Sequence, residues 1–286
     1  MKFKRAAKYG FCAGVRIADK KVKKFARLGG RDGSILGQVV HNERVVDEMA
    51  DLGVPTIEAL AEAGGGTVVF SAHGVPPSFH DDARRAGLKI LDTTCPFVYD
   101  IHDEADAAVA AGTHLVFIGK PDHREVIGYT HDRDPATYHV LTTVDEAREI
   151  DWGRYPAVKV LYQTTLNADD YEDVVGYIES RTARVSRADT ICYATKENQD
   201  AVRELGTDPE VDVILVIGGR RSANTRHLWE IGRRFKPTYL VHDIGDLDPE
   251  WFAAAATVGI TAGASTPDYM IDEVEAAVSS LAAAPV

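Results

Sequence analysis

The feature of this sequence that most constrains its fold is a pattern that recurs along the chain. A short apolar or β-branched run is followed by a polar or Gly-rich turn, and then by a stretch with helical periodicity. Examples are residues 35–49, 66–75, 88–105, 114–126, 158–170, 211–231 and 257–278. Such repeats are typical of βα units around parallel sheets. The sequence therefore predicts an α/β fold, and 286 residues with 45% apolar content are enough for two or three compact units.

In each repeat, the polar side chains that could carry chemistry follow the predicted strand directly. In open α/β sheets, ligands bind at the carboxyl ends of the strands. Each following helix presents free N–H groups and the positive end of its dipole there. We therefore expect the functional site at these strand ends.

The charge balance narrows the range of partners. The chain has 44 acidic and 32 basic residues, a net charge of −12 and no basic stripe. This balance repels phosphate backbones, so we expect no nucleic-acid partner, and an anionic ligand must be held by local groups. No apolar run of 18 or more residues occurs, so we expect no membrane segment. The first residues do not form an apolar secretory segment either, which predicts a cytoplasmic protein.

Three cysteines, Cys12, Cys95 and Cys192, are too few for a disulfide scaffold, and an odd number fits a reducing compartment. They divide the chain into intervals that are each about the size of one small α/β unit. This spacing predicts three similar lobes, each offering one thiol to a shared centre. The expected lobes are residues 14–96, 97–193 and 194–286.

Three distant cysteines can also be no more than small buried hydrophobic side chains, because free Cys is among the most buried residue types. Their surroundings favour ligation, since each lies in turn-like or strand-end sequence, in YGFCAGV, DTTCP and DTICYAT. A 4Fe–4S cluster held by three thiolates leaves one iron open as a Lewis acid beside an electron relay. Zinc with three Cys ligands and an open position is the competing metal.

Three histidines, His41, His73 and His123, are predicted at the starts of helices that follow strands. Such a histidine can be purely structural, but near an anion an imidazole can be held protonated and supply charge as well as a donor. Glu125 follows His123 by two residues and offers a carboxylic acid on the same turn. Its alternative interpretation is an ordinary first-turn Glu favoured by the helix dipole.

Hydroxyl and amide groups mark three further turns, which are Thr164–Thr165, Ser222–Asn224 and Ser265–Thr266. Each turn taken alone can be an N-cap. Together they describe an anion cradle, because phosphate binding at helix N-termini needs small, donor-rich turns such as GGRRSAN and TAGAST. Neither a Walker A nor a G-x-G-x-x-G pattern occurs, which disfavours a nucleotide site.

The ordered set of these motifs resembles a known family. FCAGV, VVHN, SAHGV, DTTCP, HREV, QTTL, DTICYAT and GITAGAS occur in this order from about residue 9 to about residue 270. They resemble the 4-hydroxy-3-methylbut-2-enyl diphosphate reductase family, which catalyses the last step of the non-mevalonate isoprenoid pathway. The resemblance implies a trefoil of three similar α/β lobes with mostly parallel sheets around a central 4Fe–4S cluster. It also implies that residues 1–13 join the last lobe.

The resemblance further implies the chemistry and the residues that perform it. A small allylic diphosphate would lose its hydroxyl by reduction, with electrons from a ferredoxin or flavodoxin, to give isopentenyl and dimethylallyl diphosphates. Glu125 would supply the proton, supported by Thr164 and by His123. The implied cluster ligands are Cys12, Cys95 and Cys192. The implied diphosphate ligands are His41, His73, His123, Thr165, Ser222, Asn224 and Ser265.

Some positions depart from the family pattern beside the expected substrate. The turn GGRRSAN has Gly219, Arg221 and Ala223 in place of typical residues, Arg124 replaces a usual Pro, and Asn167 follows TTL where a Ser is usual. Lys120–Asp122 precedes His123 where a Gly-His stretch is common. Two alternatives therefore stay open: a divergent paralogue that acts on another allylic or alkynyl diphosphate, and a non-catalytic cluster-binding redox sensor. A zinc hydrolase is a further alternative, although it would not need three distant lobes.

Overall fold

The computed structural model describes residues 1–30 and 32–283. Contacts divide the chain into two compact units. Unit 1 comprises Met1–Ile17, Val40–Met49 and the chain from Tyr193 onward, and unit 2 comprises Ala18–Val39 and Ala50–Cys192. Within the described residues, every helix is too short or too polar to span a membrane.

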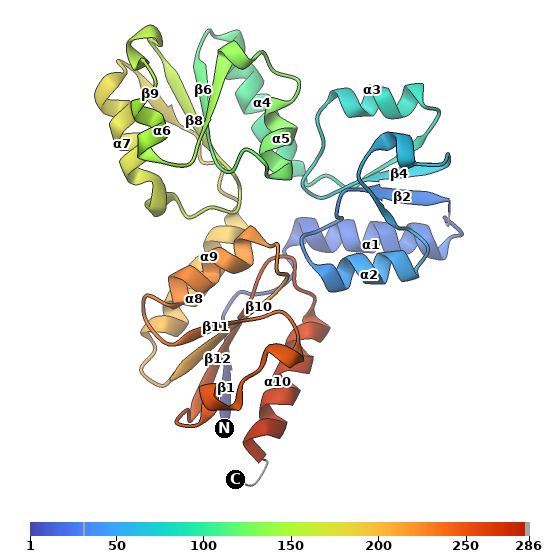
Figure 1. Cartoon of the computed structure of the whole chain (residues 1–286), viewed down its shortest axis with the longest axis vertical. Coiled ribbons are helices and arrows are strands. Elements are labelled where there is room, and N and C mark those ends of the chain that lie inside the picture. Colours follow the sequence, from blue (N-terminus) through green and yellow to red (C-terminus); the bar gives the residue numbers. More distant parts are fainter. Residues whose placement is uncertain (31, 284–286) are drawn as a thin grey trace. The chain divides into compact units, whose positions relative to one another are not determined.

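Unit 1 contains one sheet of four parallel strands, in the order β1-β12-β10-β11 (Figure 1). The strands are β1 (Lys2–Arg5), β10 (Val213–Ile217), β11 (Thr238–Val241) and β12 (Thr257–Ala262). In the register of the sheet, Lys2 lies opposite Thr257 and Val213 opposite Val258. The first strand of the chain is therefore an edge strand of the sheet built from its last third.

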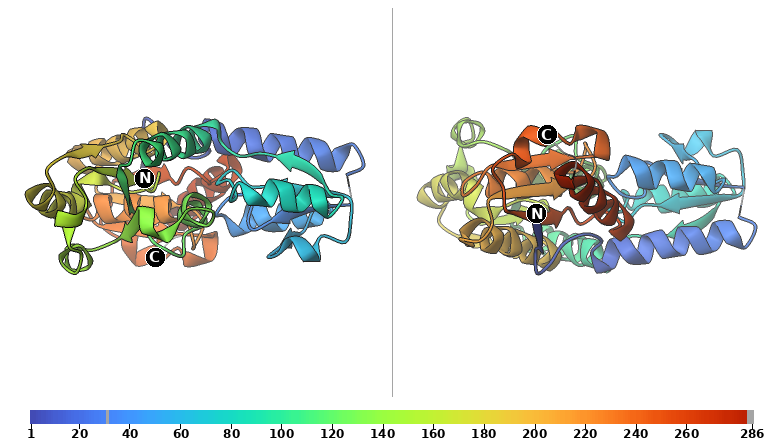
Figure 2. Two further views of the ribbon diagram at one scale, coloured as in Figure 1. Left: turned by 90° about the horizontal axis from the view of Figure 1, so that it is seen from above. Right: turned by 90° about the horizontal axis from the view of Figure 1, so that it is seen from below.

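Helices cover both faces of this sheet (Figure 1, Figure 2). They are α8 (Tyr193–Thr207) and α9 (Ala223–Gly232) on one face and α10 (Asp268–Ala283) on the other. Alternate residues of β10 pack on opposite faces: Leu215 lies in the cluster under α10, and Ile214 lies in the cluster under α8 and α9. Burial on both faces explains why β10 is an unbroken apolar run rather than an alternating one.

Unit 2 contains two sheets, in the orders β3-β2-β4-β5 and β7-β6-β8-β9, and all their strand pairs are parallel. The first sheet consists of β2 (Gly33–Leu36), β3 (Thr56–Ile57), β4 (Thr67–Phe70) and β5 (Lys89–Asp92). The second consists of β6 (His114–Ile118), β7 (Tyr138–Leu141), β8 (Val158–Tyr162) and β9 (Val185–Arg187).

The second sheet of unit 2 has apolar clusters on both faces. Its helices are α4 (Pro96–Ala110) and α5 (Arg124–Thr130) on one face, and α6 (Val144–Arg148) and α7 (Glu172–Arg181) on the other. The first sheet packs against α3 (Ser78–Arg85) through Ala83. The remaining helices are α1 (Ala13–Arg27) and α2 (Glu43–Asp51).

The three sheets share one strand order. In each, two consecutive strands pair, the third lies on the other side of the first, and the outermost strand leads to a cysteine: β5 to Cys95, β9 to Cys192 and β1 to Cys12. Each cysteine is followed by a helix, which is α4, α8 or α1. Three similar parallel sheets with flanking helices confirm the predicted α/β fold class.

Candidate active site

The predicted binding residues fall at repeated positions after the strands. His41, His123 and Ser222 are each the fifth residue after the first strand of a sheet, which ends at Leu36, Ile118 or Ile217. A second set follows the third strand of each sheet by three residues, and its members are His73, Thr165 and Ser265. The parallel sheets thus present two such positions at each carboxyl edge, where ligands of α/β folds bind.

This pattern corrects one expectation. His73 does not begin a helix, because it lies in the turn after β4 and α3 starts only at Ser78. His123 is the N-cap of α5, and His41 lies two residues before the start of α2. The expectation was wrong because a polar turn after a strand looks the same in sequence whether a helix begins at once or several residues later.

Each cysteine is attached to its sheet by the same backbone hydrogen bond. The N–H of Cys12 donates to the carbonyl of Ala264 at 3.1 Å, that of Cys95 to Ala72 at 3.1 Å, and that of Cys192 to Thr164 at 3.0 Å. The acceptor is always the second residue after the third strand of a sheet. All three thiols are half-buried and free of disulfides. Each therefore lies beside a strand end and at a helix N-terminus, where the helix dipole favours a negatively charged ligand set.

Glu125 is a buried acid of unit 2, with 1% of its surface exposed. Its Oε1 accepts the backbone N–H of Thr164 at 2.7 Å and the hydroxyl of Tyr129 at 3.1 Å. Its Oε2 lies 2.9 Å from the hydroxyl of Thr164. Burial raises the pKa of Glu125 from 4.5 to about 7, and it outweighs the three hydrogen bonds, which act in the opposite direction. Glu125 can therefore hold a proton near neutral pH and release it, as a general acid must.

Thr164 joins the acid to one of the thiols. Its N–H and hydroxyl both contact the Glu125 carboxyl, and its carbonyl accepts the N–H of Cys192. Thr164 is buried, so these bonds are little exposed to competition from water. A single turn after β8 thus sets the distance between a proton donor and a potential metal ligand.

Two imidazoles also lie near this acid in unit 2. The rings of His73 and His123 are perpendicular, with centroids 6.2 Å apart. Nδ1 of His123 accepts the N–H of Glu125 at 3.3 Å, which assigns the proton of a neutral ring to Nε2. Thr165 is the residue after Thr164, and its hydroxyl accepts a hydrogen bond from the side-chain amide of Gln163 at 2.9 Å. Unit 2 therefore brings together a carboxylic acid, two histidines and two hydroxyls.

Unit 1 gathers a second group of predicted binding residues. The Ser265 hydroxyl donates to the carbonyl of His41 at 3.1 Å and lies 3.4 Å from the Ser222 hydroxyl. Ser222 is the N-cap of α9 and accepts the N–H of Thr225. Gly219 lies so close that a Cβ there would come within 2.5 Å of the His41 carbonyl. The turn that departs from the family pattern is therefore packed against His41.

Asn224 in this group is buried, and neither side-chain amide atom has a hydrogen-bond partner among the described residues. A buried amide without a partner is costly, so such a group is expected to meet a ligand. Its N–H₂ is a donor that suits an anion. The chemistry of this donor set, a primary amide with two hydroxyls at the start of a helix, fits a phosphate group.

The residues that depart from the family pattern have other surroundings. Arg221 is exposed and makes no hydrogen bond or ion pair to another described residue. Its neighbour Arg220 is paired with Asp243 and Asp246. In unit 2, Arg124 forms an ion pair with Glu58 beside a small cavity of about 130 Å³. These charges flank the predicted site residues without contacting them in the described structure.

Tyr129 is a residue of the candidate site that the sequence motifs do not include. It lies four residues after Glu125 on α5, is 2% exposed, and donates to the carboxyl. The spacing of four residues, which brings side chains together on a helix, was the available signal. Without that signal, a single Tyr in an apolar helix is interpreted as a residue of the hydrophobic core.

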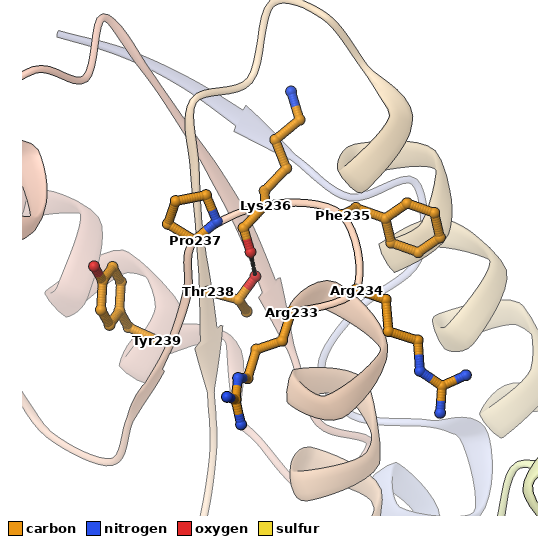
Figure 3. Close-up of a pocket in the computed structure, with 7 residues that line it drawn as sticks. All are labelled: Arg233, Arg234, Phe235, Lys236, Pro237, Thr238 and Tyr239. Atoms are coloured by element: carbon orange, nitrogen blue, oxygen red, sulfur yellow. Dashed lines mark hydrogen bonds between the residues drawn. The ribbon is translucent and has the colours of Figure 1, made fainter.

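A separate hollow of about 400 Å³ lies in unit 1 where α9 leads into β11 (Figure 3). It is lined by residues 233–239, and the Thr238 hydroxyl donates to the carbonyl of Lys236 at 2.9 Å. Its lining has no cysteine, histidine or carboxylate. This hollow is therefore not part of the candidate site.

Among residues 1–30 and 32–283, no group of three His, Cys, Asp or Glu side chains could hold a single metal ion. Three cysteines without disulfides at strand ends, with a buried acid linked through Thr164 to one of them, define a class of protein: an α/β protein with thiols and a buried carboxylic acid at the carboxyl ends of its strands.

Comparison with known proteins identifies the family. Residues 3–279 match the family described as LytB protein, and the chain belongs to this family. A relative named 4-hydroxy-3-methylbut-2-enyl diphosphate reductase from Burkholderia pseudomallei is 41% identical over 95% of this chain and 87% of its own length. A relative of the same name from Aquifex aeolicus is 35% identical over 95% of this chain and 94% of its own length. The resemblance drawn from the motifs is thus confirmed.

Two solved structures are similar to the chain. The E-1-hydroxy-2-methyl-but-2-enyl-4-diphosphate reductase from Plasmodium falciparum has a TM-score of 0.89 at 26% identity, over 96% of this chain and 87% of that one. A structure titled (E)-4-hydroxy-3-methyl-but-2-enyl diphosphate reductase, the terminal enzyme of the non-mevalonate pathway, has a TM-score of 0.71 at 34% identity. It matches 98% of this chain and 100% of that one. The fold is therefore that of this reductase family.

The Glu125 proton should make stability depend on pH. Below about pH 4.5 the carboxyl is neutral in the folded and unfolded chains. Between pH 4.5 and about 7 the unfolded chain loses the proton first, so the folded state becomes less stable as pH rises. Glu125→Gln lacks this titration. Its unfolding free energy minus that of the wild type should therefore rise by about 3 kcal/mol across this window.

Urea unfolding of the substrate-free protein at a series of pH values measures this difference. Glu179→Gln is the matched control, because Glu179 is a carboxylate of α7 that is paired with Arg187 near the surface. A difference between Glu125→Gln and the wild type that stays constant with pH would show that Glu125 ionises normally.

Proposed function

We propose that this chain reduces 4-hydroxy-3-methylbut-2-enyl diphosphate to isopentenyl and dimethylallyl diphosphates. The observation that carries the proposal is the buried Glu125 carboxyl, which accepts hydrogen bonds from the N–H and the hydroxyl of Thr164. The carbonyl of Thr164 in turn accepts the N–H of Cys192. The family and the names of the relatives support the same reaction. A sensor without catalysis would need no proton donor, so this arrangement favours the enzyme over the regulator.

The proposed reaction breaks the bond between carbon and the substrate hydroxyl. The hydroxyl leaves as water with one proton, which Glu125 supplies, and two electrons and a second proton complete the new C–H bond. Thr164 holds the Glu125 carboxyl through its N–H and hydroxyl. His123 caps the helix that carries Glu125 and so keeps the acid in place. We assign the electrons to a ferredoxin or flavodoxin.

The proposed cofactor is a 4Fe–4S cluster held by Cys12, Cys95 and Cys192. The chemistry of the donors fits, because all three are half-buried thiols at helix starts and form no disulfide. When bound, such a cluster supplies electron transfer and one iron without a cysteine ligand, which is a Lewis acid. Cysteines that form no disulfide also support a reducing, cytoplasmic location. Lobes at residues 14–96, 97–193 and 194–286 with 1–13 would then each contribute one thiol.

We assign the diphosphate to the repeated strand-end positions and to Asn224. The supporting observation is the unpartnered, buried amide of Asn224 beside the Ser222 N-cap. Imidazole, hydroxyl and amide donors can neutralise and bind a diphosphate locally, which an acidic chain requires. The proposed ligands are His41, His73, His123, Thr165, Ser222, Asn224 and Ser265.

Turnover of the C5 diphosphate by anaerobically purified, cluster-loaded protein with a chemical reductant tests the proposal. Glu125→Gln should keep iron, sulfide and substrate affinity while kcat falls about a hundredfold or more, because the variant lacks the proton. Glu179→Gln should behave as the wild type. Turnover of Glu125→Gln near the wild-type rate would show that the proton comes from elsewhere.

The ligand assignment has its own test. Replacing Cys12, Cys95 or Cys192 by Ser should remove most iron and sulfide and abolish turnover, because the chain has only these three cysteines. Iron and acid-labile sulfide are measured per chain. Thr94→Ser, next to Cys95, serves as the control and should keep both. A cysteine variant with full iron, sulfide and activity would remove that residue from the ligand set.

A second candidate function is the reduction of a different allylic or alkynyl diphosphate, which the altered turn at residues 219–224 favours. Ala223 lacks a hydroxyl there, and the exposed Arg221 could replace it with a bidentate contact to phosphate. We expect Arg221→Ala to raise KM for the C5 diphosphate about tenfold with little change in kcat, and added Ala223→Ser to restore it in part.

Arg226→Ala, an exposed arginine on the helix that follows this turn, is the control and should leave KM unchanged. An unchanged KM in Arg221→Ala would contradict the compensation. If the cluster-loaded wild type does not reduce the C5 diphosphate at all, the turn is adapted to another substrate.

A further inference from the structure

Tyr129 is buried beside the acid but has no part in the function proposed so far. Its ring stacks on Phe117 with a centroid distance of 5.8 Å and an interplanar angle of 15°. It belongs to the apolar cluster under α4, against which Cys95 also packs. Its hydroxyl donates to Oε1 of Glu125 at 3.1 Å, and no other partner of this hydroxyl occurs among the described residues. The orientation of this buried hydroxyl is therefore fixed by its one hydrogen bond to Glu125.

The two oxygens of Glu125 have different neighbours. Oε1 faces two donors, the N–H of Thr164 at 2.7 Å and the Tyr129 hydroxyl at 3.1 Å. A backbone N–H can only donate. Among the residues that the structure describes, Oε2 has one hydrogen-bond partner, the Thr164 hydroxyl at 2.9 Å, which can either donate or accept. A proton on Oε1 would turn the Tyr129 hydroxyl away from its only partner, whereas a proton on Oε2 satisfies every group.

We propose that Tyr129 is a positioning residue that keeps the Glu125 proton on Oε2, from where it passes through the Thr164 hydroxyl. In this transfer the proton on Oε2 moves to Oγ1 of Thr164, and the Thr164 hydroxyl proton moves to the departing hydroxyl of the substrate. Glu125 becomes a carboxylate and Thr164 is unchanged. Tyr129 gives a hydrogen bond throughout but no proton. The assignment of the proton acceptor rests on the proposed function.

The pKa of the Tyr129 hydroxyl agrees with this passive function. Burial and the nearby Glu125 charge raise the pKa well above its ordinary value of 10. The hydroxyl therefore stays protonated when Glu125 ionises, and it stabilises the carboxylate that the transfer leaves behind.

The position of the proton can be tested without substrate by infrared difference spectroscopy of the cluster-loaded protein at a pH below 7, where Glu125 is neutral. The carbonyl stretch of Glu125 is assigned by its loss in Glu125→Gln. If Oε1 is the carbonyl oxygen, Tyr129→Phe removes one of its two donors, and the band must move to higher frequency. Tyr155→Phe, a tyrosine stacked on His114, is the control and should leave the band in place. A band that does not move in Tyr129→Phe would overturn the proposal.

The path through Thr164 is tested by a double-mutant cycle. Tyr129→Phe should lower kcat about fivefold to tenfold with KM nearly constant, the effect of one hydrogen bond. Thr164→Val removes the hydroxyl but keeps the N–H, and in that background Tyr129→Phe should lower kcat no further. Multiplying effects would show that Tyr129 acts independently of Thr164 and overturn the path.

Unchanged iron content and melting temperature of Tyr129→Phe are required, so that lost folding is not mistaken for lost positioning. If the wild type itself does not reduce the C5 diphosphate, the proposed function fails, and the infrared band still decides where the proton lies.

Discussion

The backbone hydrogen bond from each cysteine to the turn after a third strand is the contact on which the candidate site depends. It joins Cys12, Cys95 and Cys192 to carbonyls at the carboxyl edges of three parallel sheets. In a parallel sheet all strands end at one edge, so the segment after the outermost strand lies beside the turn after the neighbouring strand. The hydrogen bond from the cysteine connects these two segments, and a helix begins directly after the cysteine. A conformational requirement of the sheet thus places a thiol at a helix N-terminus in each of the three sheets.

In the sheet of β6 to β9, the turn that bonds to the cysteine also positions the carboxyl group of Glu125. Thr164 contributes its carbonyl to Cys192 and its N–H and hydroxyl to Glu125. The burial of Glu125 favours its neutral form, whereas these donors favour its anion, and burial has the larger effect. The opposing contributions leave the group close to the point where it can both hold and release a proton. A more exposed carboxyl with the same donors would be ionised at neutral pH.

The α/β class and the strand-end location of the candidate residues could be predicted from the sequence, because strands, turns and helices of βα units have distinct residue patterns. The motifs of the reductase family then assigned functions to single residues. The position of His73 was mispredicted because a polar turn after a strand does not show how soon a helix begins. The contribution of Tyr129 could not be predicted because it depends on which oxygen of the buried Glu125 carboxyl the Tyr129 hydroxyl contacts. A local sequence pattern carries no information on such a contact.

The pairing of β1 with β12 has a consequence for the synthesis of the protein. Strand β1 is translated long before its partner strand β12, Thr257–Ala262. Both sheets of unit 2 consist of strands between Gly33 and Arg187, so their strands are all available while translation continues. The hydrogen bond from Cys12 to Ala264 can form only after Ala264 has been translated. A ligand that binds all three thiols in this folded arrangement can therefore be inserted only after that point, although the last of the thiols, Cys192, is translated earlier.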